Sequence, residues 1–182
     1  MVLYNDRIRL EDFANAVRLK GIVKEKSEAY NIANTVMNFF GYEERIIDNS
    51  LGQEVRNLFY ELEDNKILLS QKEDHVLPDR KNWIIFYWVF NKHEIFSTLE
   101  KDRLLKDNFL NEIDRMDEME LEEFKQVVKK IENGEATKEE LGIEFCNIEQ
   151  YLEILKETEI IDSTKDENMY HVTNKERLGV LY

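Results

Sequence analysis

Apolar residues recur at helical spacing in three segments of the first 65 residues. The pattern predicts helices over residues 9–19, 27–40 and 51–65, because positions three and four apart share one helix face. Gly41 has the place of a C-terminal cap glycine for the second helix, and residues 41–49 are expected to form the connection to the third. Ser50 and Gln53 fit a capping box at the start of the third helix.

The next segments have the pattern of two strands. Residues 67–69 are apolar, residues 70–81 are polar and contain the only proline, and residues 82–90 are rich in β-branched and aromatic side chains. This predicts a strand, a long loop and a second strand. Three helices followed by a two-stranded hairpin is the order of a winged helix, a variant of the helix-turn-helix.

The same order returns near the C-terminus. We expect helices over residues 117–132 and 147–157, a short helix capped by Thr137 and Glu140 between them, and a shorter hairpin formed by residues 160–161 and 169–173. Residues 56–71 align without a gap with residues 149–164, and apolar positions fall on apolar positions. The alignment favours a shared fold for the two units, although a helix-then-strand pattern can also arise by chance.

Residues 93–116 join the two units. They contain no helix breaker, and their apolar residues recur at mostly three- or four-residue intervals, which predicts one long helix. The expected fold is therefore mainly α with small β-hairpins (α+β): tandem winged-helix-like units joined by a long helix. We expect an N-terminal unit at residues 1–91, a linker helix at 92–116 and an acidic C-terminal unit at 117–182.

Composition places the chain among intracellular globular proteins. The single cysteine, Cys146, excludes an intramolecular disulfide and a cysteine-cluster metal site, and no signal peptide is recognisable at the N-terminus. The longest apolar run, residues 83–90, is too short to cross a bilayer as a helix. We therefore expect a cytoplasmic protein without a membrane partner.

Charge separates the two units. The chain has a net charge of −14, and residues 117–182 hold eight Lys and Arg against 18 Asp and Glu. Nucleic-acid binding draws affinity from cations that neutralise phosphates, so the C-terminal unit is a poor candidate for contacting DNA. A protein partner with a basic surface fits this charge, and acidity that serves solubility alone is the other explanation.

Signals of catalysis are nearly absent. His75, His93 and His171 are far apart, the sequence has no glycine-rich phosphate loop, and Cys146 lies in no nucleophile motif. We expect no catalytic residue, no cofactor and no metal site. An enzyme would need an acidic cluster in a pocket, which spacing alone does not reveal.

The third helix of a winged helix is the one that reads DNA. In the first unit its exposed side chains include Gln53, Arg56 and Asn57, which have the chemistry to contact base edges, and Arg80 and Lys81 precede the second strand. Three carboxylates on the same helix would face phosphates. Scattered surface charge is the simpler explanation of these cations.

Both faces of the strand at residues 82–90 are apolar. A wing normally hides one face, so the other needs cover from the linker helix, from a second copy in a homodimer, or from another protein. The candidate interface residues are Trp83, Ile85, Tyr87 and Trp88 of the strand, with Leu99 and Phe109 of the linker helix.

The segment NFFGYEERIIDN at residues 38–49 is distinctive. Together with residues 58–63 and the aromatic strand, it resembles a family of uncharacterised archaeal proteins, over about residues 10–90. The resemblance implies an archaeal source, and it implies no reaction and no catalytic residues.

Two functions follow as hypotheses. The first is a non-enzymatic interaction protein that acts as a regulator or assembly factor of archaeal information-processing machinery through protein contacts. The alternative is a dimeric DNA-binding transcription regulator that uses the N-terminal unit.

Overall fold

A computed structural model describes residues 7–76, 82–134, 137–145, 147–163 and 169–182. The described chain is mainly helical, with two small antiparallel sheets, as the α+β expectation requires. It divides into two compact units, Met1–Asp102 and Arg103–Tyr182. None of the helices in the described part of the chain is both long and apolar enough to cross a membrane.

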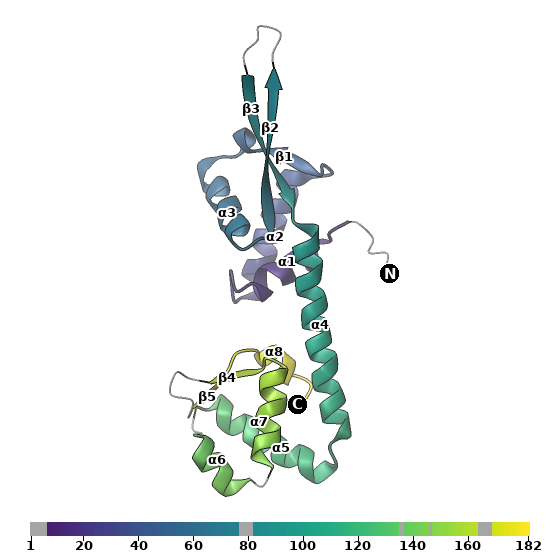
Figure 1. Cartoon of the computed structure of the whole chain (residues 1–182), viewed down its shortest axis with the longest axis vertical. Helices are drawn as coiled ribbons and strands as arrows, with labels where there is room; N and C mark the ends of the chain where they lie inside the picture. Colours follow the sequence, from purple (N-terminus) through teal and green to yellow (C-terminus); the bar gives the residue numbers. More distant parts are fainter. Residues whose placement is uncertain (1–6, 77–81, 135–136, 146, 164–168) are drawn as a thin grey trace. The chain divides into compact units, whose positions relative to one another are not determined.

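The first unit contains the three predicted helices and a three-stranded sheet (Figure 1). Its elements, in chain order, are α1 (Leu10–Leu19), α2 (Lys26–Phe40), β1 (Arg45–Ile47), the 3₁₀ turn η1 (Asp48–Ser50), α3 (Gln53–Asp64), β2 (Leu68–Val76) and β3 (Asn82–Phe90). The sheet order is β1-β3-β2, and both pairings are antiparallel. Gly41 ends α2 with a φ of 55°, as predicted for a cap glycine.

Aromatic rings fill the core of the first unit. Phe40 of α2 stacks on Phe90 with ring centroids 4.0 Å apart, and Phe59 of α3 meets Trp88 edge to face at 5.6 Å. Each buried ring contributes on the order of 1.5–3 kcal/mol through the apolar surface removed from water. The other large side chains of this core that are fully buried are Phe13, Leu62, Ile67, Leu68 and Ile95.

Two predicted loops of the first unit contain strands. The connection at residues 41–49 includes β1, which pairs Arg45–Ile47 with the base of β3. The polar stretch after Leu69 continues as β2 to Val76, and each of its residues has a partner on β3. Most side chains of β2 are exposed and polar, so the sequence has no apolar pattern that would predict this strand. The strand forms because its backbone groups pair with those of β3. The remainder of that predicted loop, residues 77–81, lies outside the described residues.

The predicted capping box of α3 is wrong. The residue before the helix is Gly52, which has no side chain to cap it. Ser50 belongs to η1, and its hydroxyl donates to the carbonyl of Ile47 at 2.6 Å. The hydroxyl therefore closes the turn before the helix and does not cap the helix itself.

The second unit follows the predicted order. It contains α5 (Glu118–Glu132), α6 (Lys138–Glu144), α7 (Ile148–Glu157), β4 (Ile161–Ser163), β5 (Tyr170–Val172) and α8 (Lys175–Leu178). The capping box of Thr137 and Glu140 is confirmed. An isolated bridge joins Thr137 to Met169, next to the β4–β5 pair. Phe124, Val127, Tyr151 and Leu155 lie in its core.

The two units end their third helices in the same way. Lys66 and Glu159, which occupy equivalent positions in the aligned segments, are the two non-glycine residues with positive φ in the described chain, at 62° and 54°. The next residue in each case donates its N–H back to the helix, Ile67 to Leu62 and Ile160 to Leu155. The alignment of residues 56–71 with 149–164 therefore extends to backbone geometry.

The long helix predicted at residues 93–116 is present as α4 (Lys92–Arg115). The boundary between the two compact units falls inside it, after Asp102. Ile95, near its start, is buried in the core of the first unit, and Phe109, near its end, is buried in the core of the second.

Candidate interaction surfaces

The exposed face of α3 carries more carboxylates than cations. Most of the side chains expected there are exposed, namely Gln53, Glu54, Asn57, Glu61 and Asp64. Gln53 donates its amide to Asn57 at 2.9 Å, so these two candidate base-reading side chains bind each other along the helix. Tyr60 lies on the same helix with 48% of its surface exposed.

Arg56 is held inside the first unit. Its Nε donates to the Asp48 carboxylate at 3.2 Å, and its second guanidinium nitrogen donates to the carbonyls of Asp48 and Leu51 at 3.1 Å each. Asp48 also accepts the indole N–H of Trp88 at 2.9 Å. The arginine therefore ties α3 to η1 and the sheet, a role that its place on the helix did not indicate.

The other two candidate nucleic-acid contacts, Arg80 and Lys81, lie outside the described residues. Among the described residues, no group of three or more His, Cys, Asp and Glu side chains could hold a metal ion. His75, His93 and His171 are all exposed.

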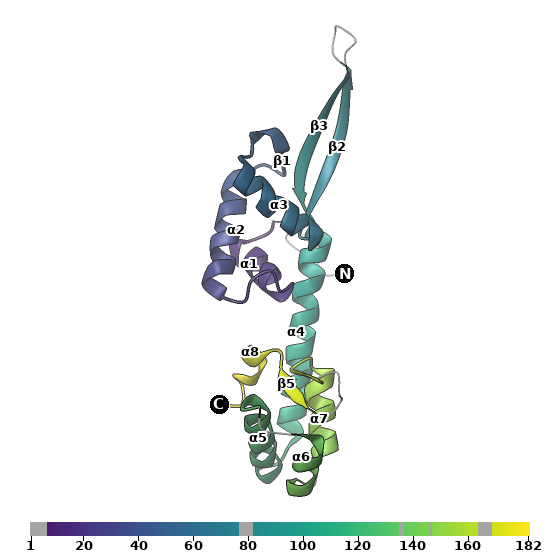
Figure 2. The same cartoon turned by 90° about the vertical axis from the view of Figure 1, so that its left-hand side faces the viewer.

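The outer half of the β2–β3 hairpin extends beyond α1, α2 and α3. Figure 2 shows it from the side, clear of the helices. Trp83, Ile84 and Phe86 have 59%, 49% and 50% of their surface exposed. Ile85 and Tyr87 are half-buried. The outer part of β3 is therefore an exposed apolar surface, which α4 does not cover.

The remaining candidate interface residues are placed elsewhere. Trp88 is 2% exposed and Phe109 is 1% exposed, each inside the core of its unit. Leu99 is half-buried against the first core. The sequence of β3 does not distinguish the buried inner end of the strand from its exposed outer end, because both ends are equally apolar.

One side of the sheet is covered by an ion pair near its base. Arg45 of β1 pairs with Glu73 of β2, and its guanidinium lies 4.3 Å from the ring centroid of Tyr87 on the strand between them. The hydrogen bond from Arg45 lowers the pKa of Glu73 and raises the pKa of Arg45. This pair shields the central strand, and Trp83 lies beyond its reach toward the tip.

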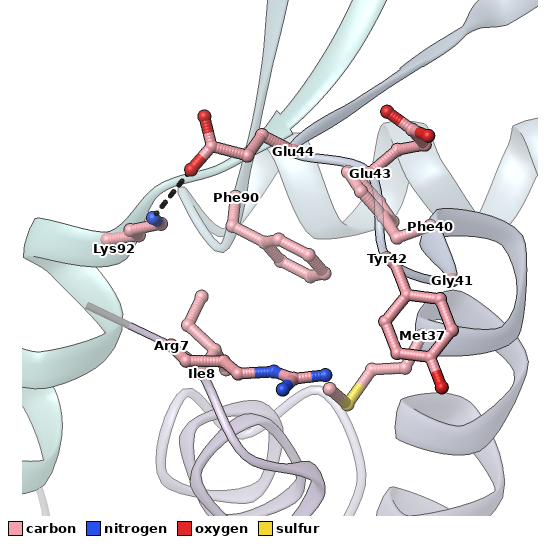
Figure 3. A pocket seen from close by; sticks show the side chains of 10 residues that line it. All are labelled: Arg7, Ile8, Met37, Phe40, Gly41, Tyr42, Glu43, Glu44, Phe90 and Lys92. Atoms are coloured by element: carbon pink, nitrogen blue, oxygen red, sulfur yellow. Dashed lines mark ion pairs between the residues drawn. The ribbon is translucent and has the colours of Figure 1, made fainter. Parts of the chain in front are cut away.

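A pocket of about 430 Å³ opens where α2 ends (Figure 3). Phe40, Phe90, Met37 and Ile8 give it an apolar lining. Figure 3 shows Phe90 between the Lys92–Glu44 pair on one side and Arg7 on the other. The pocket lies within the first unit, and residues 40–44, in the first half of the distinctive motif at residues 38–49, supply part of its wall.

Opposite charges balance around the pocket. Lys92 lies 3.5 Å from Glu44, and the guanidinium of Arg7 lies 5.8 Å from the ring centroid of Tyr42. Tyr42 is 94% exposed, so the rim is open to solvent. Sequence reasoning missed this pocket because its lining combines an N-terminal residue, the end of α2 and the junction of β3 with α4.

Residues 7–134 match a family of unknown function, DUF6015. The match covers more than half of the chain. The chain belongs to this family. Searches of curated proteins and of solved structures each found no match.

The family match includes every surface described above. The exposed face of α3, the β2–β3 hairpin and the pocket all lie within residues 7–134, and so do α4 and α5. It extends beyond the resemblance seen at residues 10–90, into the acidic last third. Helices α6, α7 and α8 lie outside it, so the features shared by the family belong chiefly to the first unit.

Proposed function

We propose that this chain is a non-enzymatic interaction protein built from two winged-helix units, a regulator or assembly factor of archaeal information-processing machinery that acts through protein contacts. The element order supports the winged-helix assignment. In the first unit, α2 is followed by β1, η1, α3 and the β2–β3 hairpin, and β1 pairs with β3. In the second unit, α5, α6 and α7 precede the β4–β5 hairpin, and Thr137 bridges to Met169 in the place of that first strand.

The proposal rests on the charge of the exposed face of α3. A DNA-reading helix needs cations that are free to reach phosphates and base edges. Here the only cation of the helix, Arg56, donates to Asp48 and Leu51, and the exposed face presents Glu54, Glu61 and Asp64. Such a face repels the phosphate backbone of a nucleic acid and attracts a protein surface rich in Lys and Arg.

The same face suits a protein partner with a basic surface. Its carboxylates can pair with Lys or Arg side chains, and the exposed Tyr60 offers an aromatic contact of the kind enriched at interfaces. Steering by these charges acts mainly on the rate of association, so partner binding should weaken as salt is added.

Affinity capture with a charge-reversed variant tests this proposal. The tagged full chain and the variant Glu54→Lys/Glu61→Lys are compared in extracts of the source cell, with Glu118→Lys/Glu122→Lys on the exposed side of α5 as the matched control. We expect a protein in stoichiometric amount with the native chain and the control, and its loss with the α3 variant. Capture of no such protein, or equal capture by all three, would contradict the proposal.

Duplex DNA binding is the alternative, and it makes a separate prediction. A dimeric regulator that used the first unit would bind duplex DNA at low ionic strength, lose affinity steeply as salt rises, and bind less well with Arg56→Ala. We expect fluorescence anisotropy to detect no such binding by the folded native chain. Salt-sensitive binding of duplex DNA by the folded native chain would favour the alternative.

A further inference from the structure

The outer half of β3 has a free edge. β2 pairs with β3 along its whole length on one side, whereas β1 pairs on the other side only with Tyr87, Trp88 and Val89. Residues 82–86 therefore have a hydrogen-bonding edge that no strand of the described chain occupies. This edge belongs to the same five residues that include the exposed Trp83, Ile84 and Phe86.

The register identifies which backbone groups point to that edge. The N–H of Asn91 donates to the carbonyl of Ile67, which continues the β2–β3 ladder and marks this as a hydrogen-bonded pair. Hydrogen-bonded and non-hydrogen-bonded pairs alternate along an antiparallel ladder. The backbone N–H and C=O groups of odd-numbered β3 residues therefore point toward β2, and those of even-numbered residues point away from it. The same alternation directs the N–H of Ser70 away from β3, and that N–H donates to Glu63. Asn82, Ile84 and Phe86 therefore present their N–H and C=O groups to the free edge.

The two edges of the hairpin differ in chemistry. β2 contains Lys72, Glu73, Asp74 and His75, and charged residues of this kind discourage pairing with another strand. β3 contains no charged residue over its nine positions. A long, apolar and uncharged edge is the type of strand that pairs with another strand when one is offered.

The geometry points to a second copy of this chain as the occupant of that edge, with β3 pairing antiparallel to the β3 of its partner about Ile84. In this register Ile84 lies opposite its own counterpart, and Asn82 lies opposite Phe86 in both directions. All three outward-facing residues of both copies then form hydrogen-bonded pairs. The pairing ends at Phe86, because Ile47 of β1 occupies the edge at Tyr87.

Self-pairing fits the charges better than pairing with a charged segment. The chain has a net charge of −14, so two copies repel each other wherever their acidic surfaces meet. β3 has no charged residue, so a contact through β3 avoids this repulsion at the interface itself. Trp83 of each copy meets the partner's Ile85 on one face of the joined sheet, and on the other face the two Ile84 side chains meet between uncharged Asn82–Phe86 pairs. A symmetric contact through one strand also closes at two copies and does not extend into a filament.

The dimer is expected to be weak. A five-residue strand pair buries less than the roughly 1,200 Å² of the smaller specific interfaces, so half-association should require about 10–100 µM chain. This inference does not depend on what α3 binds, because β3 and α3 expose different surfaces. Loss of partner capture through α3 would leave the dimer unaffected.

Proline substitution separates edge pairing from folding. Pro is tolerated where an edge N–H faces solvent, so Ile84→Pro removes an N–H needed only by the dimer. Lys72→Pro makes the same change at an outward-facing position on the β2 edge. By analytical ultracentrifugation of the full chain, we expect native chain and Lys72→Pro to dimerise alike, and Ile84→Pro to weaken dimerisation at least about tenfold. Circular dichroism confirms that each variant is folded.

A disulfide tests the register itself. In a Cys146→Ser background, Ile84→Cys places two cysteines opposite each other at about 5.5 Å between Cα atoms, a separation that a disulfide can span. We expect a dimer cross-linked by oxidation that is absent for Met119→Cys, an exposed position on α5. A chain that stays monomeric to several hundred micromolar (on the order of ten times the expected range), a dimer unaffected by Ile84→Pro, or no Ile84→Cys cross-link would overturn the inference.

Discussion

Asp48 joins three elements of the first unit. It accepts hydrogen bonds from Arg56 of α3 and from the indole of Trp88 on β3, and it opens the turn η1 itself. Trp88 is 2% exposed, so its N–H has little access to water. A buried donor that loses its acceptor costs more free energy than the hydrogen bond contributes while it is made.

We expect Asp48→Ala to lower the free energy of unfolding of the first unit by about 1–3 kcal/mol. Asp48→Asn keeps a side-chain oxygen for Trp88 and should cost less. Denaturant unfolding followed by fluorescence in a Trp83→Phe background measures both, because Trp88 is then the only tryptophan. Equal losses for the two substitutions would show that the indole does not depend on this acceptor.

Arg56 shows what sequence reasoning misses at this scale. Helical spacing placed it on the outer side of α3, and an arginine there has the chemistry to read a base edge. Its acceptors are one carboxylate eight residues earlier and two main-chain carbonyls. Every residue has a main-chain carbonyl, so the sequence does not show which carbonyls accept from Arg56. These contacts can be recognised only from the backbone path of η1.

At the scale of elements, α3 and α7 end in a shared left-handed turn. Lys66 and Glu159 hold a backbone conformation that costs a residue with a Cβ on the order of 1 kcal/mol. Both side chains are exposed, so burial of apolar surface does not offset that cost.

Glycine at either position should stabilise the chain. We expect Lys66→Gly and Glu159→Gly each to raise the free energy of unfolding of its own unit by about 0.5–1 kcal/mol. Lys129→Gly, at an exposed helical position of α5, should instead lower it by a similar amount. Denaturant titration followed by circular dichroism distinguishes the two signs, and destabilisation by all three would contradict the assignment of the turns.

The capping box of α6 makes the second unit sensitive to acid. The backbone N–H and the hydroxyl of Thr137 both donate to Glu140 and lower the pKa of its carboxyl. A lowered pKa means that the stabilisation is complete above the ordinary glutamate value of about 4.3 and is lost as the pH falls through the folded value. We expect Glu140→Gln to flatten the decline in unfolding free energy of the second unit below that pH. An unchanged pH profile would contradict this origin.

The sequence indicated helices better than strands. Helices α1, α2, α5 and α7 have an apolar face at helical spacing, and packing then forms them where the spacing predicts. β1 is three residues long, too short for any alternation to be recognised. Beyond Leu69, β2 is mostly polar on both faces. It pairs with β3 along its whole length, so the residues that determine this strand lie in another segment.

At the scale of the whole molecule, each unit has its own hydrophobic core. The two core clusters share no residue, and both tryptophans lie in the first unit. Tryptophan fluorescence therefore reports on the first unit alone, whereas circular dichroism reports on both.

We expect Phe124→Ala to destabilise only the second unit. Phe124 is fully buried in α5, so removing the ring should cost about 3–5 kcal/mol. Part of the circular dichroism transition should then move to lower denaturant while the tryptophan transition stays in place. A tryptophan transition that moves by the same amount would show that the two units unfold as one.

A photo-reactive residue at the centre of the α3 face tests the central claim most directly. A benzoylphenylalanine replaces Asn57, which is exposed, in the full chain, and Asn111 on α4 is replaced in the same way as a control. After irradiation in the source cell, mass spectrometry identifies the adducts. We expect a defined protein adduct at position 57 that is missing at position 111. Adducts with nucleic acid alone at position 57 would contradict a protein-binding role for this face.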